Sequence, residues 1–275
     1  MTIPNPLRYL PLAIASIVLL GGCASAPKAA SGSLIAADAT MEHTRGQPQS
    51  LRERRLDRAA IAQARTVHIQ APVFAGDVGV PLTPREREVL LAGLARKLCL
   101  RIADYFEVVS ADRPADLVIR SEITGVGVTS LTAAAASLVG GALSPVPFTP
   151  RLPAGLGGLA VNVIAQRNDG SEVLALRWAQ GANAFTTDAT PSRIGDAYEL
   201  ADELATDMRK LLREQGEAGQ RPRPRPRIDR KLRSAGESEC ETAFGRIDPA
   251  AMLARYALPL TPEMIEPEMA TKAAR

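Results

Sequence analysis

The side chains whose chemistry the sequence pattern best defines are its three cysteines, Cys23, Cys99 and Cys240. A cysteine can be acylated, oxidised to a disulfide or bound to a metal, and its position in the chain decides among these. Cys23 follows an apolar run at residues 11–20 and two glycines, and Arg8 is the only charge before the run. A basic start, an apolar core of this length and small residues before a cleavage point are typical of a secretory signal that is too short to span a membrane. We therefore predict that residues 1–22 are a signal peptide.

The stretch Leu20-Gly21-Gly22-Cys23 resembles the lipobox of bacterial lipoproteins. The resemblance implies that the signal is removed and that acyl chains on the thiol and amine of Cys23 attach the protein to a membrane. The following residue is alanine rather than aspartate, which in Gram-negative lipoproteins implies an outer-membrane location facing the periplasm. The alternative is a buried free cysteine in an uncleaved helix, and it gives the two glycines no role.

Cys99 and Cys240 remain as an even pair in a compartment that oxidises thiols. A disulfide between them would close a loop of about 140 residues, which the chain-entropy model values at about 4–5 kcal/mol. It would also bring the C-terminal part of the chain back onto the helix that carries Cys99. The alternative is a small buried thiol at Cys99 and a loose thiol at Cys240.

Other patterns exclude most catalytic and metal chemistry. The two histidines are His43, in a polar N-terminal stretch, and His68, which alternates with apolar residues as a solvent-side strand residue does. No Cys-x-x-Cys, His-Glu-x-x-His, calcium-loop or Gly-x-Ser-x-Gly spacing occurs. Gly125-Val126-Gly127 lacks the third glycine of a dinucleotide-binding loop. We therefore expect a protein without catalytic residues, bound metal or cofactor.

Four arginines alternate with prolines in a basic segment near the C-terminus: Arg221, Arg223, Arg225 and Arg227. Alternating prolines favour polyproline II, which spaces successive arginines about 6 Å apart. Guanidinium groups in such a strip could bind lipopolysaccharide phosphates, anionic lipid or cell-wall polymers. The alternative is a solvated linker. Residues 221–233 have a net charge of +6, so the rest of the chain after the signal is about −4, and nucleic-acid binding is not indicated.

Composition and periodicity predict four parts: the signal peptide, a tether at residues 23–60, a globular domain at 61–216 and an Arg/Pro-rich, mostly disordered tail at 217–275. The domain is predicted to have an α+β fold, a two-layer sandwich of about five strands with two main helices on one face, between flexible tails. Thr83, Pro84 and Glu86 form a capping box before the first helix. Asp169-Gly170 predicts a tight hairpin turn. The expected strands lie near residues 66–73, 105–109, 117–123, 159–165 and 174–178, and the helices near 84–102 and 194–212.

Residues 126–150 contain no charged side chain. The pair Gly140-Gly141 and three prolines interrupt the stretch and it has few large apolar residues, so a membrane span is not expected. One interpretation is a long insertion that lies against the sheet. The other is an apolar surface for a partner or a membrane, because long loops in compact domains are usually functional or disordered.

The order of these elements behind a lipobox resembles an uncharacterised bacterial lipoprotein family, domain-of-unknown-function family 3313. The resemblance covers roughly residues 31–215. It implies the fold and an envelope location, and it implies no chemistry. The short Ser31-Gly32-Ser33-Leu34 departs from the Gly-aromatic-Leu opening of such proteins, and the Arg-Pro segment lies outside the match. The stretches that carry the resemblance are residues 67–73, the capped helix from Thr83, 115–120 and 169–175.

Three classes of function remain open. The first is a lipid-anchored accessory or assembly factor that binds another envelope protein. The second is a module that binds an anionic surface through the Arg-Pro segment. The third is an enzyme whose site has no recognisable signature.

Overall fold

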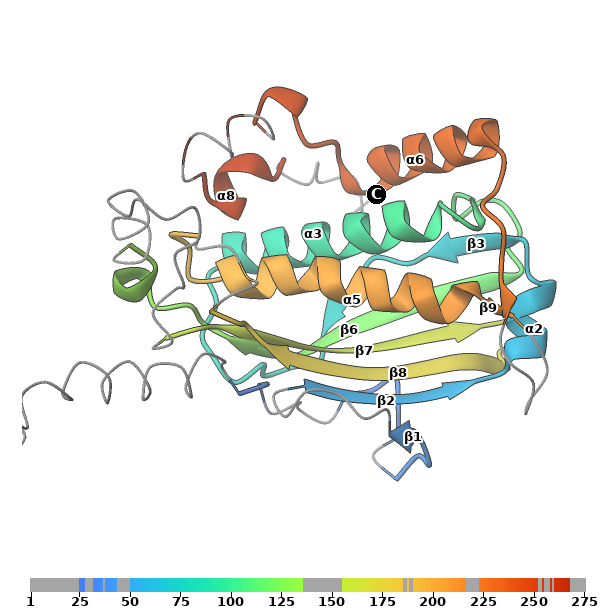
Figure 1. The fold of residues 1–275 in the computed structure, drawn as a ribbon, viewed down its shortest axis with the longest axis horizontal. Coiled ribbons are helices and arrows are strands. Elements are labelled where there is room, and N and C mark those ends of the chain that lie inside the picture. The colour runs from blue at the N-terminus through green and yellow to red at the C-terminus, as the bar shows by residue number, and fades with distance from the viewer. Residues whose placement is uncertain are drawn as a thin grey trace, which may run out of the picture.

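The computed structural model describes residues 25–27, 32–36, 38–43, 50–135, 155–184, 187, 190–215, 223–251, 254, 258 and 260–267. Its main feature is one open, mixed sheet with a layer of helices on one face (Figure 1). This arrangement agrees broadly with the predicted α+β sandwich. In this part of the chain, no helix is both long enough and apolar enough to span a membrane.

The sheet has eight strands in the order β1-β2-β8-β7-β6-β3-β5, with β4 paired to β6. β6, β7 and β8 are long, antiparallel central strands, whereas β3, β4 and β5 pair in parallel. β7 and β8 form the predicted hairpin, and Gly170 in its turn has a φ of +82°, a conformation that glycine adopts without strain. The strands are β1 (Glu42–His43), β2 (Ser50–Leu56), β3 (Thr66–Ile69), β4 (Val73–Phe74), β5 (Glu107–Val108), β6 (Leu117–Gly127), β7 (Gly158–Gln166) and β8 (Glu172–Gly181).

Two long helices, α3 (Pro84–Ile102) and α5 (Gly195–Arg213), pack side by side on one face of the sheet (Figure 1). α3 begins with the predicted capping box, in which Thr83 accepts a hydrogen bond from the Glu86 amide and the Glu86 carboxylate accepts one from the Thr83 amide. The apolar stripes of both helices are buried against β6, β7 and β8 in the main core, which includes Trp178.

The sheet has eight strands rather than about five, and the N-terminal stretch expected to be a tether supplies part of the difference. β1 and β2 lie within it, and the short helix α2 (Arg58–Gln63) begins in it. β2 has the sequence SLRERRL, which lacks the apolar alternation of a half-buried strand. Arginines of β2 and α2 form ion pairs with acidic residues on and after α5. Arg52 of β2 lies 3.0 Å from Asp207, and Arg58 of α2 lies 3.3 Å from Glu214.

The C-terminal segment, expected to be mostly disordered, also forms structure. α6 (Arg230–Phe244) packs on α3 and β5, and α8 (Pro262–Ile265) packs on α3. β10 (Arg223–Pro224) pairs with β9 (Glu214–Gln215) in a small second sheet. These elements are stabilised by contacts with residues far away in the sequence, so local periodicity did not predict them.

Candidate functional site

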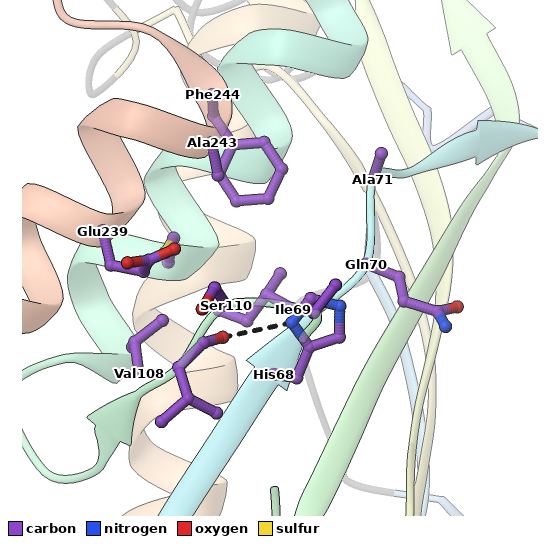
Figure 2. Close-up of a pocket in the computed structure, with 12 residues that line it drawn as sticks. His68, Ile69, Gln70, Ala71, Val108, Ser110, Glu239, Ala243 and Phe244 are labelled. Atoms are coloured by element: carbon purple, nitrogen blue, oxygen red, sulfur yellow. Dashed lines mark hydrogen bonds between the residues drawn. The ribbon is translucent and has the colours of Figure 1, made fainter. Parts of the chain in front are cut away.

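A cavity of about 370 Å³ lies where α6 covers the edge of the sheet beside β3 and β5 (Figure 2). The wall is mostly apolar, and its rim includes the exposed Gln70 and Ala71 after β3 and Ala243 of α6. The polar groups that line it come from three separate elements. The residues that define its chemistry are His68, Ile69, Val108, Ser110, Glu239 and Phe244.

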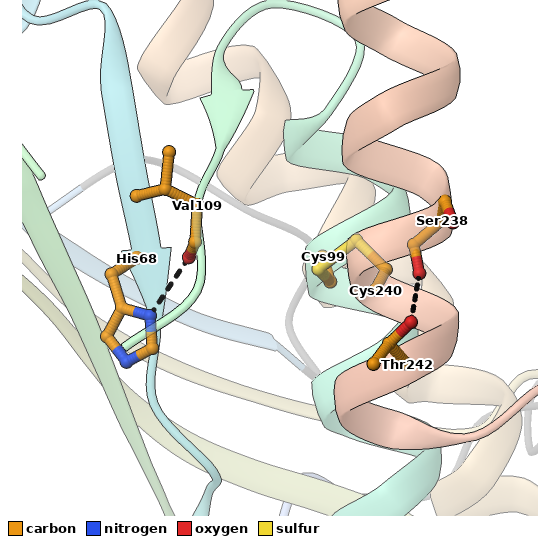
Figure 3. The surroundings of a disulfide bond; sticks show 6 residues. All are labelled: His68, Cys99, Val109, Ser238, Cys240 and Thr242. Carbon is orange, nitrogen blue, oxygen red and sulfur yellow. Dashed lines mark hydrogen bonds between the residues drawn. A yellow bond between two sulfur atoms is a disulfide. The ribbon is translucent and has the colours of Figure 1, made fainter. Parts of the chain in front are cut away.

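His68 reaches the cavity because it alternates along β3 with the buried Val67 and Ile69. Its Nδ1 lies 3.1 Å from the backbone oxygen of Val109 (Figure 3). A carbonyl oxygen only accepts, so Nδ1 is the donor in this bond, and Nε2 is an acceptor when the ring is neutral. The sequence pattern predicts a solvent-side strand residue here, but the structure places His68 half-buried in a cavity wall, because α6 folds over this edge.

Helix α6 forms the opposite wall, and a disulfide joins it to α3 (Figure 3). Cys99 and Cys240 are both buried, with their Cα atoms 5.7 Å apart and 141 positions between them in sequence. Asp229 caps the start of α6 by accepting a hydrogen bond from the Lys231 amide. Gly236 of α6 is buried beside Ala103 and Val108, where a Cβ would make ordinary van der Waals contacts at 3.4 and 3.6 Å.

The polar groups of the cavity suit binding better than catalysis. The Ser110 hydroxyl hydrogen-bonds Asp112, and this bond is the largest influence that lowers the pKa of that carboxyl. It is therefore not paired with His68 as an activated nucleophile would be. Across the described residues, no group of three or more His, Cys, Asp or Glu side chains is arranged to hold a metal ion. An apolar wall with one imidazole acceptor and the Glu239 carboxylate fits an apolar group that ends in a donor or a positive charge.

The predicted arginine strip is not presented to solvent as a unit. Arg225 turns inward and donates to the backbone oxygens of Ala64, Ile61 and Ala62, at the C-terminal end of α2. Its guanidinium also stacks over the Phe106 ring at 4.3 Å. Burial lowers the pKa of Arg225. The carbonyls that end a helix attract a cation, and this accounts for the inward turn.

The other residues of the strip have different surroundings. Arg227 is exposed and hydrogen-bonds Tyr105. Burial raises the pKa of the Tyr105 phenol, but hydrogen bonds from Arg213 and Arg227 outweigh it and lower the pKa below its ordinary value. Arg223 lies in β10, and Arg221 is outside the described residues, as is the predicted lipidation site Cys23.

A second polar site, on the opposite face of the sheet, has no counterpart in the sequence predictions. Glu122 of β6 is fully buried and accepts hydrogen bonds from the amides of Ser33 and Leu34 at 3.0 and 2.9 Å. Asn162 of β7 donates to the same carboxylate at 3.1 Å. A Cβ at Gly32 would overlap this carboxylate, so glycine is required for the close approach. The signal in the sequence was a glutamate within the apolar strand at residues 117–123.

These contacts fix an N-terminal strap, residues 32–36 and 38–43, across the outer face of the sheet. Ile35 of the strap packs with Ile164 and Ala175 in a small second core. The stretch that composition described as a tether is therefore part of the fold over residues 32–36, 38–43 and 50–60. Burial raises the pKa of Glu122, but hydrogen bonds from Leu34, Asn162 and Ser33 outweigh it and hold the pKa below its ordinary value.

We expect Glu122→Gln to lower the free energy of unfolding by about 1–3 kcal/mol at pH 7, because an amide cannot accept all of these hydrogen bonds. A carboxyl whose pKa is lower in the folded state stabilises the fold above its unfolded pKa, and this contribution disappears as pH falls through the folded pKa. The difference in the free energy of unfolding between parent and variant should therefore become smaller from pH 7 towards pH 3. Urea unfolding at both pH values measures it, with the exposed Glu42→Gln as control. A constant difference would contradict a titrating role for Glu122.

Comparison with known proteins places the domain in a family. No curated protein matches the sequence. Among solved structures, the PelC dodecamer from Paraburkholderia phytofirmans matches with 13% identity over 63% of this chain and 95% of that chain, at a TM-score of 0.33. A DUF4136 family protein from Bacteroides thetaiotaomicron matches with 13% identity over 59% of this chain and 97% of that chain, at a TM-score of 0.29.

One family profile matches residues 33–208, described as "Protein of unknown function (DUF3313)". The match begins in the N-terminal strap and runs through the whole eight-stranded sheet into α5. Because it covers more than half of the 275 residues, the chain belongs to the DUF3313 family, as its resemblance in sequence pattern implied.

Proposed function

We propose that this chain is a lipid-anchored protein of the bacterial outer membrane that faces the periplasm and binds another envelope component without catalysing a reaction. The observation that carries the proposal is the disulfide between Cys99 and Cys240. Structural disulfides persist in exported proteins and are rare in reducing cytosol. The disulfide therefore supports the secretory signal and lipobox that precede the domain.

The binding role rests on the cavity between α6 and the edge of the sheet. It combines apolar walls with a few polar groups from separate elements, as small binding sites do. The Arg-Pro strip is a weaker candidate for binding, because Arg225 is engaged by three backbone oxygens and an aromatic ring. Of the three classes of function, a protein-binding accessory factor is therefore the one that the geometry favours.

The anchoring half of the proposal predicts that Cys23→Ser leaves the protein as an uncleaved precursor or releases it from membranes. Two or three acyl chains give stable attachment, whereas one is marginal. Fractionation of a Gram-negative host and mass spectrometry of the N-terminal peptide measure the outcome, with Ser25→Ala as the matched control. Normal processing of Cys23→Ser and an unchanged membrane fraction would contradict the proposal.

The binding half is tested in the same membranes with a photoreactive residue on α6. Ala243 lies on the rim of the cavity, whereas Ser238 is exposed on α6 and does not line it. We expect a residue at position 243 to capture one stoichiometric envelope protein and the same residue at 238 to capture none. Equal capture from both positions, or none from either, would show that the cavity is not the binding surface.

A further inference from the structure

The N-terminal segment runs along the outer face of the sheet in a definite direction, opposite α3 and α5 (Figure 1). Ile35 packs on Ile164 of β7, and the preceding residues of the strap bond Glu122 beside Asn162 of β7. Further back, Pro27 lies against the first residue of β7, since a Cβ on Gly158 would come within 2.7 Å of the proline ring. As the chain is followed towards its N-terminus, its contacts on β7 therefore move from residue 164 to 158.

This path determines where Cys23 can lie. It lies four positions before Pro27, and even a fully extended chain spans only about 14 Å over that distance. The hairpin turn at the other end of β7 is about ten residues away from Gly158, or about 33 Å along the strand. Acyl chains on Cys23 would therefore be held near the start of β7 and could not reach the hairpin turn.

The two ends of the sheet differ in charge. Around the start of β7, residues 123–135, 155–165 and 178–184 carry no charged side chain, and Leu131 is 46% exposed. Among the described residues, the charges beside this end are engaged by other groups. Asp196 is buried and accepts from the Gly157 amide, Arg193 bonds Glu86, and Arg52 and Glu203 both hydrogen-bond Gln180. The hairpin end instead presents charged groups, among them Arg167, Asp169, Glu172 and Asp116.

From the path of the chain and this difference in charge, we propose that the end of the sheet formed by residues 127–131 and 155–158 rests on the lipid headgroups. The inference rests on the proposed acyl anchor at Cys23. A surface without charged side chains loses little hydration when it meets lipid, whereas the hairpin end would have to desolvate several charges. The occupant is the bilayer to which the anchor attaches.

The same orientation keeps the cavity accessible. β3 pairs with β6 only over residues 117–119, at the end of β6 that is remote from Gly127. The cavity follows directly after β3, so it lies away from the proposed lipid contact. An envelope partner could therefore reach α6 and His68 while the domain stays on the membrane.

Tryptophan reporters at the two ends test the orientation. Protein that begins at Cys23 is coupled through that thiol to a maleimide phospholipid in vesicles, while Cys99 and Cys240 remain in their disulfide. Leu131→Trp reports on the uncharged end and Asn168→Trp on the hairpin turn; both positions are exposed, and the native Trp178 is buried and serves as a constant background. We expect brominated lipids to quench the emission of Leu131→Trp and to leave Asn168→Trp and the parent unchanged. Soluble acrylamide should give the opposite ranking of the two variants.

Equal quenching of both variants, stronger quenching of Asn168→Trp, or no quenching of either would overturn the proposed orientation. Matching urea transitions for parent and variants confirm that each substitution leaves the fold intact. Chemical coupling makes the result independent of acylation in cells. If Cys23→Ser leaves fractionation unchanged, the proposed acyl anchor is wrong. If the quenching result differs from the expected one, only the proposed orientation is wrong.

Discussion

Glu266→Ala is expected to lower the free energy of unfolding by about 3–5 kcal/mol, because it leaves the buried Arg96 cation without its partner. Arg96 of α3 donates to the Glu266 carboxylate at 2.6 Å, and the two side chains are 4% and 0% exposed. Tyr198 of α5 donates to the same carboxylate. Glu266 therefore joins the C-terminal segment to both long helices.

The pKa shifts of Arg96 and Tyr198 keep both side chains protonated as donors to Glu266. Burial lowers the pKa of Arg96, but its hydrogen bond to Glu266 and the nearby negative charge outweigh this and raise the pKa above its ordinary value. Burial, and then the charge of Glu266, raise the pKa of Tyr198, so its phenol keeps its proton and remains a donor. Removal of the carboxylate thus affects two buried donors.

Urea unfolding of parent and variant measures the loss. Met264→Ala is the matched control, because Met264 belongs to the same short helix α8 and is 68% exposed; its substitution should change stability by less than about 0.5 kcal/mol. Arg96→Leu with Glu266→Leu should lose less than Glu266→Ala alone, since no uncompensated charge remains. If Glu266→Ala matches the control, the C-terminal segment does not contribute to the stability of the domain.

The parts of the fold that could be predicted from sequence are those determined by neighbouring residues. The start of α3 follows from a threonine, a proline and a glutamate within four positions. The β7–β8 hairpin follows from Asp169-Gly170 between two apolar alternations. The stripe of α5 follows from its helical periodicity and faces the core as expected.

The parts that could not be predicted depend on partners far away in the chain. Arg225 bonds the end of α2 across 161 positions, and Arg96 bonds Glu266 across 170. An alternation of arginine and proline is typical of an extended, solvated segment, and only the tertiary position of α2 turns one arginine inward. Glu122 was ambiguous for the same reason, since its donors come from a strap 88 and 89 residues earlier.

The cavity shows this limit most clearly. Nothing in the alternation of β3 distinguishes a histidine that faces solvent from one that faces a covering helix. α6 covers His68 because the disulfide, the cap at Asp229 and the packing of α6 on α3 and β5 hold the helix there. The candidate site therefore required the pairing of Cys99 with Cys240, which the sequence left open.

Replacement of both disulfide cysteines by alanine, Cys99→Ala with Cys240→Ala, should lower the free energy of unfolding by up to about 4–5 kcal/mol, given the 141-residue separation. The loss should be concentrated in α6. Without the disulfide, the contacts that remain for α6 include the buried Phe244 and a 3.2 Å ion pair between Arg233 and Asp104. α3 retains its packing against α5 and the sheet. α6 should therefore open locally before the domain unfolds.

Urea unfolding measures the global loss, and native-state hydrogen exchange separates the local opening from it. Amides of α6 should exchange faster in the double variant, while those of α3 and β7 keep rates set by global unfolding. Ser238→Ala is the control on the same helix, because Ser238 is exposed and contributes its backbone oxygen, rather than its side chain, to the bond with Thr242 (Figure 3). Local opening of α6 in the double variant should also weaken photocapture from position 243, because α6 forms one wall of the cavity. Unchanged α6 exchange in the double variant would show that packing alone holds this wall in place.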